Sequence, residues 1–155
     1  MLDLYDEFKA IISALVERGI DYAVCGGLAM AVYGLPRATI DIAFLIPADD
    51  FKGVKSAAKE LGYTIEANPM TFAGGAVEIR RLSKLDPVAG DLLTIDLLIV
   101  TPQLEEAWKS RTEVEWEDGK LWVVSREGLI ALKSLRGSNQ DLDDISRLKE
   151  VQDES

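Results

Sequence analysis

The 155-residue sequence contains no histidine and a single cysteine, Cys25. Without an imidazole, Ser-His-Asp and Cys-His catalytic machinery and histidine-ligated zinc are excluded. One cysteine forms neither an intramolecular disulfide nor a multi-cysteine metal site. We therefore expect any bound metal ion to have oxygen ligands, which favours magnesium or manganese.

Long apolar runs and an excess of basic residues are also missing. The longest stretch without a charged residue, 22–36, is shorter than the roughly 20 residues that a membrane-spanning helix needs. The first ten residues, MLDLYDEFKA, are acidic and amphipathic, unlike a signal or transit peptide. The 27 acidic and 17 basic residues give a net charge of −10, which argues against a broad nucleic-acid surface. We expect a soluble cytoplasmic protein with no membrane partner.

The residues that are present predict an α+β fold. An apolar fraction of 48% supports one compact domain over residues 1–155. Apolar periodicity predicts helices over 2–18, 28–33, 49–61, 103–109, 125–135 and 139–151. Short apolar or β-branched runs predict strands over 21–25, 39–46, 63–66, 77–82, 92–100, 114–116 and 120–124. Together they predict a mixed β-sheet flanked by helices, with helices at the C-terminal end.

Two carboxylates lie inside strand-like apolar runs. Asp96 is the single charged residue of 92–100, and Asp41 is the single charged residue of 39–46. A strand this apolar is usually covered on both faces, where an unpaired carboxylate costs several kcal/mol. Each acid therefore needs a cation, several backbone N–H groups or a metal ion. Each could instead lie at a strand end, facing solvent or an arginine, but their co-occurrence favours a shared oxygen-ligand metal site.

Gly26 and Gly27 follow the predicted strand 21–25 and precede a predicted helix. Such a turn presents backbone N–H groups and the positive end of a helix dipole, which suits a phosphate group. An ordinary tight turn is the alternative interpretation.

These motifs together resemble the nucleotidyltransferase fold of the DNA polymerase β superfamily. The likeness is strongest to its small bacterial members, which include toxin-type nucleotidyltransferases, and it runs from about residue 5 to residue 150. The opening motif of that family matches GGLAMAVYGLPRATIDI at 26–42, and its strand with the third acid matches TIDLL at 94–98. Its C-terminal helical motif matches LIALK at 129–133, Arg136 and QDLDDI at 140–145.

The resemblance implies a magnesium-dependent (or manganese-dependent) transfer of a nucleoside monophosphate from a nucleoside triphosphate to a hydroxyl. Asp41 and Asp96 are the implied catalytic metal ligands. On a strand, residues i and i+2 face the same side, so the Asp-x-Asp pair of the family directs two carboxylates to one place. The residues implied in binding nucleotide or phosphate are Gly26, Gly27, Arg37, Thr39, Lys133 and Arg136.

The sequence departs from the family at position 43, where the second acid of Asp-x-Asp is replaced by Ala43. Three explanations stay open: an engineered knockout, a natural degenerate member, or substitution by another carboxylate such as Glu78 or Asp91. Accordingly, an active enzyme, a catalytically inactive pseudoenzyme that binds nucleotide or a partner, and a plain structural domain are all hypotheses. Tight nucleotide binding and turnover distinguish them.

Other charged residues have structural interpretations as well as functional ones. Lys133 and Arg136 share a helix face and could form a solvated stripe that pairs with Asp141 or Asp144, for which a structural role is favoured. The cluster Arg80, Arg81 and Lys84 suggests a solvated strand edge or, less favoured, an acceptor site. The acceptor could be an RNA end, a protein hydroxyl or a small molecule, and a homodimer or partner protein could complete the cleft.

Overall fold

The structure, a computed structural model, describes residues 3–34, 41–116 and 119–154, without the side chains of Asp41 and of 151–154. The α-helices are α1 (Leu4–Glu17), α2 (Gly26–Val32), α3 (Phe51–Glu60), α4 (Glu105–Lys109), α5 (Arg126–Arg136) and α6 (Asn139–Glu154). The strands are β1 (Ala23–Cys25), β2 (Asp41–Ile46), β3 (Ile65–Glu66), β4 (Met70–Phe72), β5 (Val77–Leu85), β6 (Leu92–Ile99), β7 (Thr112–Trp116) and β8 (Gly119–Val123). The α+β prediction is confirmed.

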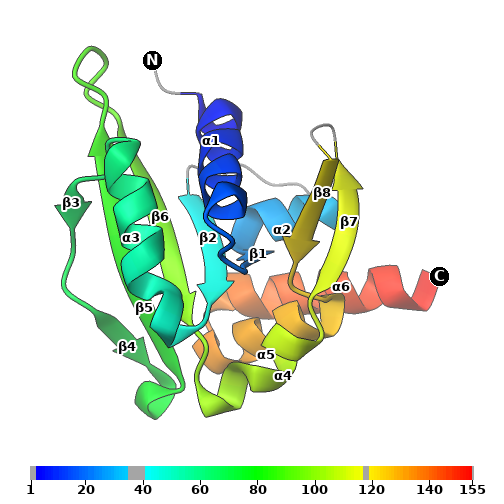
Figure 1. Cartoon of the computed structure of the whole chain (residues 1–155). Helices are drawn as coiled ribbons and strands as arrows, with labels where there is room; N and C mark the ends of the chain where they lie inside the picture. The colour runs from blue at the N-terminus through cyan, green and yellow to red at the C-terminus, as the bar shows by residue number, and fades with distance from the viewer. Residues whose placement is uncertain (1–2, 35–40, 117–118, 155) are drawn as a thin grey trace.

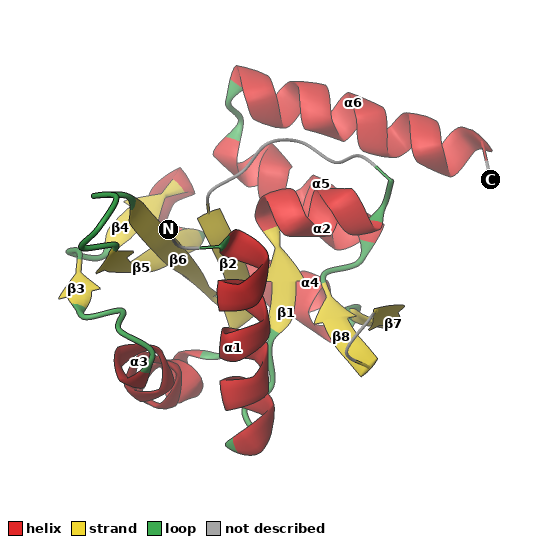
Figure 2. Ribbon diagram, turned by 90° about the horizontal axis from the view of Figure 1, so that it is seen from above, coloured by secondary structure: helices red, strands yellow, loops and turns green. Residues whose placement is uncertain are grey.

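The strands form one mixed sheet in the order β3-β5-β6-β2-β1-β8-β7, with β4 also paired to β5. The pairs β2–β6 and β1–β8 are parallel, and the other pairs are antiparallel. Helices α1 and α3 lie on one side of the sheet, and α2, α5 and α6 lie on the other (Figures 1 and 2). The predicted mixed sheet flanked by helices, with C-terminal helices, is therefore present.

Helix α1 forms because its apolar residues recur at helical spacing and its first turn is capped. The Asp3 carboxylate accepts a hydrogen bond from the Asp6 N–H at 3.0 Å, which satisfies one N–H of the first turn. Phe8, Ile11, Ile12 and Leu15 are buried against the sheet. The Phe8 ring stacks on Phe44 of β2 at 6.1 Å between centroids, which anchors α1 over the strand that carries Asp41.

The central strands β2 and β6 are covered on both faces, as their apolar runs predict. Ile42, Phe44, Leu45 and Ile46 are fully buried, and six of the eight residues of β6 are buried. The strands predicted at 114–116 and 120–124 are present as β7 and β8, which pair antiparallel, and residues 117–118 between them lie outside the described residues.

Strand β5 differs from the prediction. It extends to Leu85 and lies inside the sheet, because β3 and β4 pair with its outer side. The expectation of a solvated strand edge at the basic cluster is therefore wrong. Strand β4 was not predicted, since three residues are too few for a period-2 pattern to be recognised.

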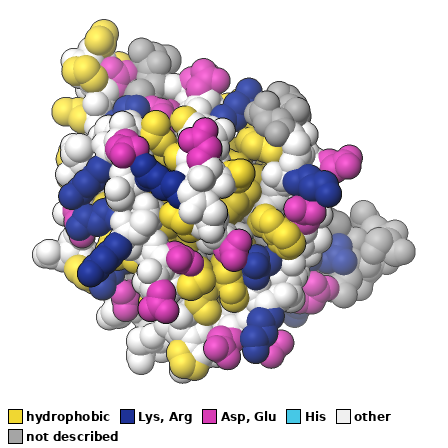
Figure 3. Space-filling model, viewed as in Figure 1, with side chains coloured by type: hydrophobic (Ala, Val, Ile, Leu, Met, Phe, Trp, Pro, Cys, Tyr) yellow, Lys and Arg dark blue, Asp and Glu magenta, His cyan; other side chains and the backbone are white. Residues whose placement is uncertain are grey.

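The face over α1 and α3 carries intermixed acidic and basic side chains, with Lys and Arg gathered on the α3 side (Figure 3). Among the described residues, no helix is long and apolar enough to cross a membrane.

Candidate functional site

A row of four side chains crosses the middle of the sheet. Cys25 of β1 is opposite Ala43 of β2, Ala43 is opposite Asp96 of β6, and Asp96 is opposite Arg81 of β5. Residues directly opposite one another on neighbouring strands project to the same face of a sheet. The fold thus brings together residues from four separate segments, and the predicted third acid lies beside the position of the missing one.

Asp96 is held by Arg81. The Arg81 Nε donates to Asp96 Oδ1 at 2.7 Å, and Nη2 donates to Oδ2 at 3.0 Å. The Asp96 side chain is 14% exposed and that of Arg81 is 41% exposed. A two-point guanidinium–carboxylate contact is among the stronger protein hydrogen-bonding arrangements. It supplies the partner that the apolar surroundings of Asp96 require.

The other acid of the predicted pair is only partly described. Asp41 is the first residue of β2 and lies opposite Thr94 of β6, one row away from Asp96. Asp41 and Ala43 are two residues apart on this strand. The Asp41 side chain, and the predicted phosphate-binding residues Arg37 and Thr39, lie outside the described part of the structure.

Gly26 lies directly against Ala43. A Cβ added at Gly26 would be 3.1 Å from the Ala43 Cβ, and Gly26 has a φ of +70°, a conformation that favours glycine. Gly26 and Gly27 are the first two residues of α2, and Gly27 is buried. The glycines therefore let the start of α2 pass close to the strand that carries positions 41 and 43.

A cavity of about 30 Å³ lies between this turn and helix α5. Lys133 and Arg136 of α5 supply its charged lining. Cys25, Gly26 and Ala43 line the side of the cavity that is next to the sheet. The structure thus brings four predicted site residues, Gly26, Lys133, Arg136 and position 43, to one place. The cavity has room for about one water molecule, so a larger ligand must lie at its mouth.

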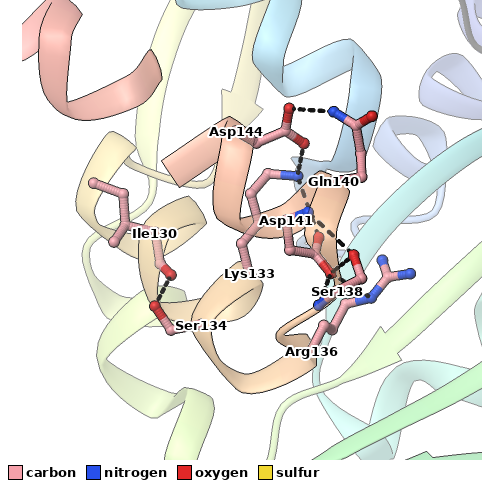
Figure 4. A network of polar contacts seen from close by, with 8 residues as sticks. All are labelled: Ile130, Lys133, Ser134, Arg136, Ser138, Gln140, Asp141 and Asp144. Carbon is pink, nitrogen blue, oxygen red and sulfur yellow. Dashed lines mark hydrogen bonds and ion pairs between the residues drawn. The ribbon is translucent and has the colours of Figure 1, made fainter. Parts of the chain in front are cut away.

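Lys133 is not a solvated residue of a basic stripe. Its side chain is 6% exposed, and its Nζ lies 2.8 Å from Asp144 Oδ2 and 3.8 Å from Asp141 Oδ1 (Figure 4). The other Asp144 oxygen, Oδ1, accepts from Gln140 Nε2 at 2.8 Å. Pairing with Asp141 and Asp144 was expected, but burial was not.

Asp141 has a helix-capping role, in agreement with the favoured structural interpretation. Its Oδ2 accepts from the Ser138 hydroxyl at 2.6 Å and from the Ser138 N–H at 3.2 Å. The Ser138 hydroxyl oxygen in turn accepts from the Asp141 N–H at 3.1 Å, which makes a reciprocal cap at the start of α6. Arg136 Nε lies 3.9 Å from Asp141 Oδ2, and the Arg136 side chain is 51% exposed. Of the two predicted cations of α5, Arg136 is therefore the accessible one.

Burial raises the pKa of the Cys25 thiol to about 12, and the negative charge of Asp96 adds to this effect. The positive charges of Lys133 and Arg136 act in the opposite direction. Cys25 is 2% exposed, so it is a small apolar core residue beside a charged site.

The described side chains do not fit a two-metal centre. The described part of the chain has no cluster of three or more Asp, Glu, Cys or His side chains able to hold a metal ion. Ala43 offers a methyl group, and both Asp96 oxygens accept hydrogen bonds from Arg81. Glu78, one proposed substitute, pairs with Arg80 at 2.8 Å. Because Glu78 and Arg80 alternate with Ile79 and Arg81 along β5, they lie on the opposite face from Asp96.

Arg81 is a site residue that the sequence did not single out, because it was recognised only as a member of the basic cluster. The strand-like runs 77–82 and 92–100 are close enough in sequence to pair antiparallel. Such a pairing can set an arginine opposite Asp96, and this is the signal that could have identified Arg81.

Comparison with solved structures shows a nucleotidyltransferase fold. The lincosamide antibiotic adenylyltransferase LnuA, bound to lincomycin, is 18% identical, with a TM-score of 0.63 over 94% of this chain and 96% of that one. ANT(2")-Ia in complex with adenylyl-2"-tobramycin is 13% identical, with a TM-score of 0.61 over 94% and 90%. TM1012 from Thermotoga maritima, assigned as a nucleotidyltransferase, is 13% identical, with a TM-score of 0.58 over 94% and 88%.

No family model and no curated protein matches the sequence. At such low identities, the structural likeness establishes the fold and leaves the activity to be argued from the site.

Proposed function

We propose that the protein binds a nucleoside triphosphate beside Gly26 and transfers its nucleoside monophosphate to a hydroxyl acceptor. In this reaction the acceptor oxygen bonds to the α-phosphorus, the bond to the β-phosphate breaks, and pyrophosphate and the hydroxyl proton leave. The observation that carries the proposal is the register of the central strands. It sets Asp96 beside position 43, which itself lies against Gly26, on a fold shared with adenylyltransferases.

The phosphate groups are proposed to lie between the start of α2 and helix α5. Backbone N–H groups at Gly26 and Gly27 and the exposed guanidinium of Arg136 are the donors that this location offers. Lys133 is proposed to organise this location from its buried position, where its ammonium pairs with Asp144. Arg37 and Thr39 are assigned to the same task through the family resemblance.

We propose that one magnesium or manganese ion binds together with the triphosphate. Asp41 and Asp96 are the proposed ligands of this ion. Such an ion neutralises phosphate charge, and magnesium readily keeps several waters in place of missing protein ligands. The methyl group at position 43 supports one ion rather than two.

A small hydroxylated molecule is the acceptor class with the most support. LnuA is described with lincomycin and ANT(2")-Ia with an adenylylated tobramycin. An RNA end or protein hydroxyl, as for a toxin-type enzyme, is the alternative, and a partner protein or a second copy of the chain would then complete the cleft.

A second candidate function is a pseudoenzyme that binds the triphosphate or a partner without transferring the nucleotide. Ala43 and the occupied carboxylate of Asp96 both favour it. A pseudoenzyme would bind the triphosphate without transferring its nucleotide. A plain structural domain would neither bind the triphosphate nor transfer the nucleotide.

A side-by-side transfer assay tests the proposal. The protein as it stands and its Ala43→Asp variant are incubated with α-labelled nucleoside triphosphates, Mg²⁺ or Mn²⁺ and an extract of small molecules, RNA and protein. We expect the variant to transfer label at least tenfold faster, because it regains the missing carboxylate. Ala89→Asp, which adds the same charge on an exposed loop, and Ala43→Asp/Asp96→Asn are the controls that should not gain. Binding without transfer by either form favours the pseudoenzyme, and neither binding nor transfer contradicts both candidates.

A further inference from the structure

We propose that Arg81 is a resident cation of the acidic site, which competes with divalent metal ions for the Asp96 carboxylate. This inference rests on the proposed function, because it concerns the metal affinity of the same site. It also explains how a carboxylate with little exposure is accommodated without a metal ion.

The geometry gives the guanidinium both oxygens of Asp96. Arg81 and Asp96 are directly opposite on β5 and β6, so the paired backbones hold the two side chains in register. The contacts of 2.7 Å and 3.0 Å use both carboxylate oxygens in the planar two-point arrangement that suits a guanidinium. A metal ion that approaches Asp96 must therefore share the carboxylate with the guanidinium or displace one of these hydrogen bonds.

The charges near Asp96 point the same way. Position 43, directly opposite Asp96 on β2, is alanine. The negative charge that the family carries there, which would attract a metal ion, is therefore missing. Arg81 neutralises Asp96 through a direct contact with both of its oxygens. Attraction for a divalent cation is thus reduced, which keeps the site in a low-affinity state.

The residue before Arg81 provides an internal comparison. Arg80 has the same charge on the same strand, but it donates to Glu78 at 2.8 Å and lies over the Phe51 ring at 5.1 Å on the opposite face. Loss of Arg80 therefore changes the net charge of the protein as much as loss of Arg81 does, without uncovering Asp96.

The test is Mn²⁺ binding, measured by electron paramagnetic resonance on the full chain. We expect Arg81→Gln to bind Mn²⁺ at least tenfold more tightly than the unmodified protein, a change of about 1.4 kcal/mol. Arg80→Gln should stay within twofold of the unmodified protein. Arg81→Gln/Asp96→Asn should lose the gain, because the added affinity resides in the uncovered carboxylate.

Arg81→Lys keeps the charge and is the second variant if Arg81→Gln fails to fold, as judged by circular dichroism. It should give a gain of at least threefold, since an ammonium cannot occupy both oxygens in the same geometry. The inference is overturned if the folded Arg81 variants bind Mn²⁺ no more tightly than the unmodified protein, or if Arg80→Gln gains as much.

Triphosphate binding by the same proteins, followed by calorimetry, separates this inference from the proposed function. Tighter Mn²⁺ binding by Arg81→Gln with no triphosphate binding by any form would support the role of Arg81 and reject the nucleotide site. Triphosphate binding with no effect of Arg81 on Mn²⁺ would reject the role of Arg81 alone.

Discussion

Asp96 and Arg81 are the two residues that determine the electrostatic character of the site. A largely covered carboxylate is stable only with hydrogen-bonding partners of suitable charge, and Arg81 provides two donors. The apolar sequence around Asp96 predicts that a partner is needed. It does not identify that partner, because Arg81 lies fifteen residues away and is brought opposite Asp96 only by the β5–β6 register.

The pKa of Cys25 depends on its burial and on the charge of Asp96 in the same row. This pKa is raised from 9.0 to about 12, so between these values the thiol is ionised in the unfolded chain and protonated in the folded one. The unfolded state then binds fewer protons, and the free energy of unfolding falls as pH rises. We expect the stability of the unmodified protein relative to Cys25→Ala to fall by about 1 kcal/mol between pH 8 and pH 10.

Urea denaturation of both proteins at the two pH values measures this difference. The tyrosines with raised pKa are common to both proteins, so their titration cancels in the comparison. A stability difference that does not change with pH would show that the thiol ionises in the folded protein as easily as in the unfolded one.

At the scale of elements, α6 is attached to α5 through a buried ion pair. Lys133 of α5 and Asp144 of α6 are 6% and 3% exposed, and their charged atoms are 2.8 Å apart. Removal of one partner of such a pair leaves an uncompensated buried charge. We expect Lys133→Met to reduce the free energy of unfolding by about 3 kcal/mol.

The double variant Lys133→Met/Asp144→Asn should recover most of that loss, because it also removes the stranded charge. Arg147→Gln is the matched control: it breaks the Arg147–Asp143 pair on the same helix, whose side chains are 59% and 54% exposed, and should cost less than about 0.5 kcal/mol. Equal effects of the two single variants in urea denaturation would argue against a buried pair at Lys133.

The elements differ in how far they could be predicted. Helix α1 follows from apolar spacing that ends at Gly19, and β2 and β6 follow from long apolar runs. Strand β5 was expected to form a solvated strand edge, and its interior place depends on pairing with β3 and β4, two short strands without a clear pattern. Burial of Lys133 depends on how α6 packs on α5, which the helical periodicity of each segment alone does not determine.

At the scale of the molecule, the sheet order assembles the site. Strand β2 lies between β1 and β6, so residues near 25, 43 and 96 become neighbours, and α5 closes the row from one face (Figure 2). A second cavity, of about 540 Å³, lies between α1 and the β7–β8 hairpin and is lined in part by Tyr22, Trp116 and Trp122. Among the described residues, none of the predicted site residues lines it, so the two locations can be distinguished by experiment.

The most direct test of the central claim is to locate the triphosphate on the protein. The amide resonances of the ¹⁵N-labelled chain are followed during titration with a non-hydrolysable nucleoside triphosphate in the presence of Mg²⁺. The account predicts that the largest shifts occur at Gly26, Gly27 and Ala43, with smaller shifts at Asp96 and Arg136. Shifts centred on Trp116 and Trp122, or no shift at any ligand concentration, would contradict it.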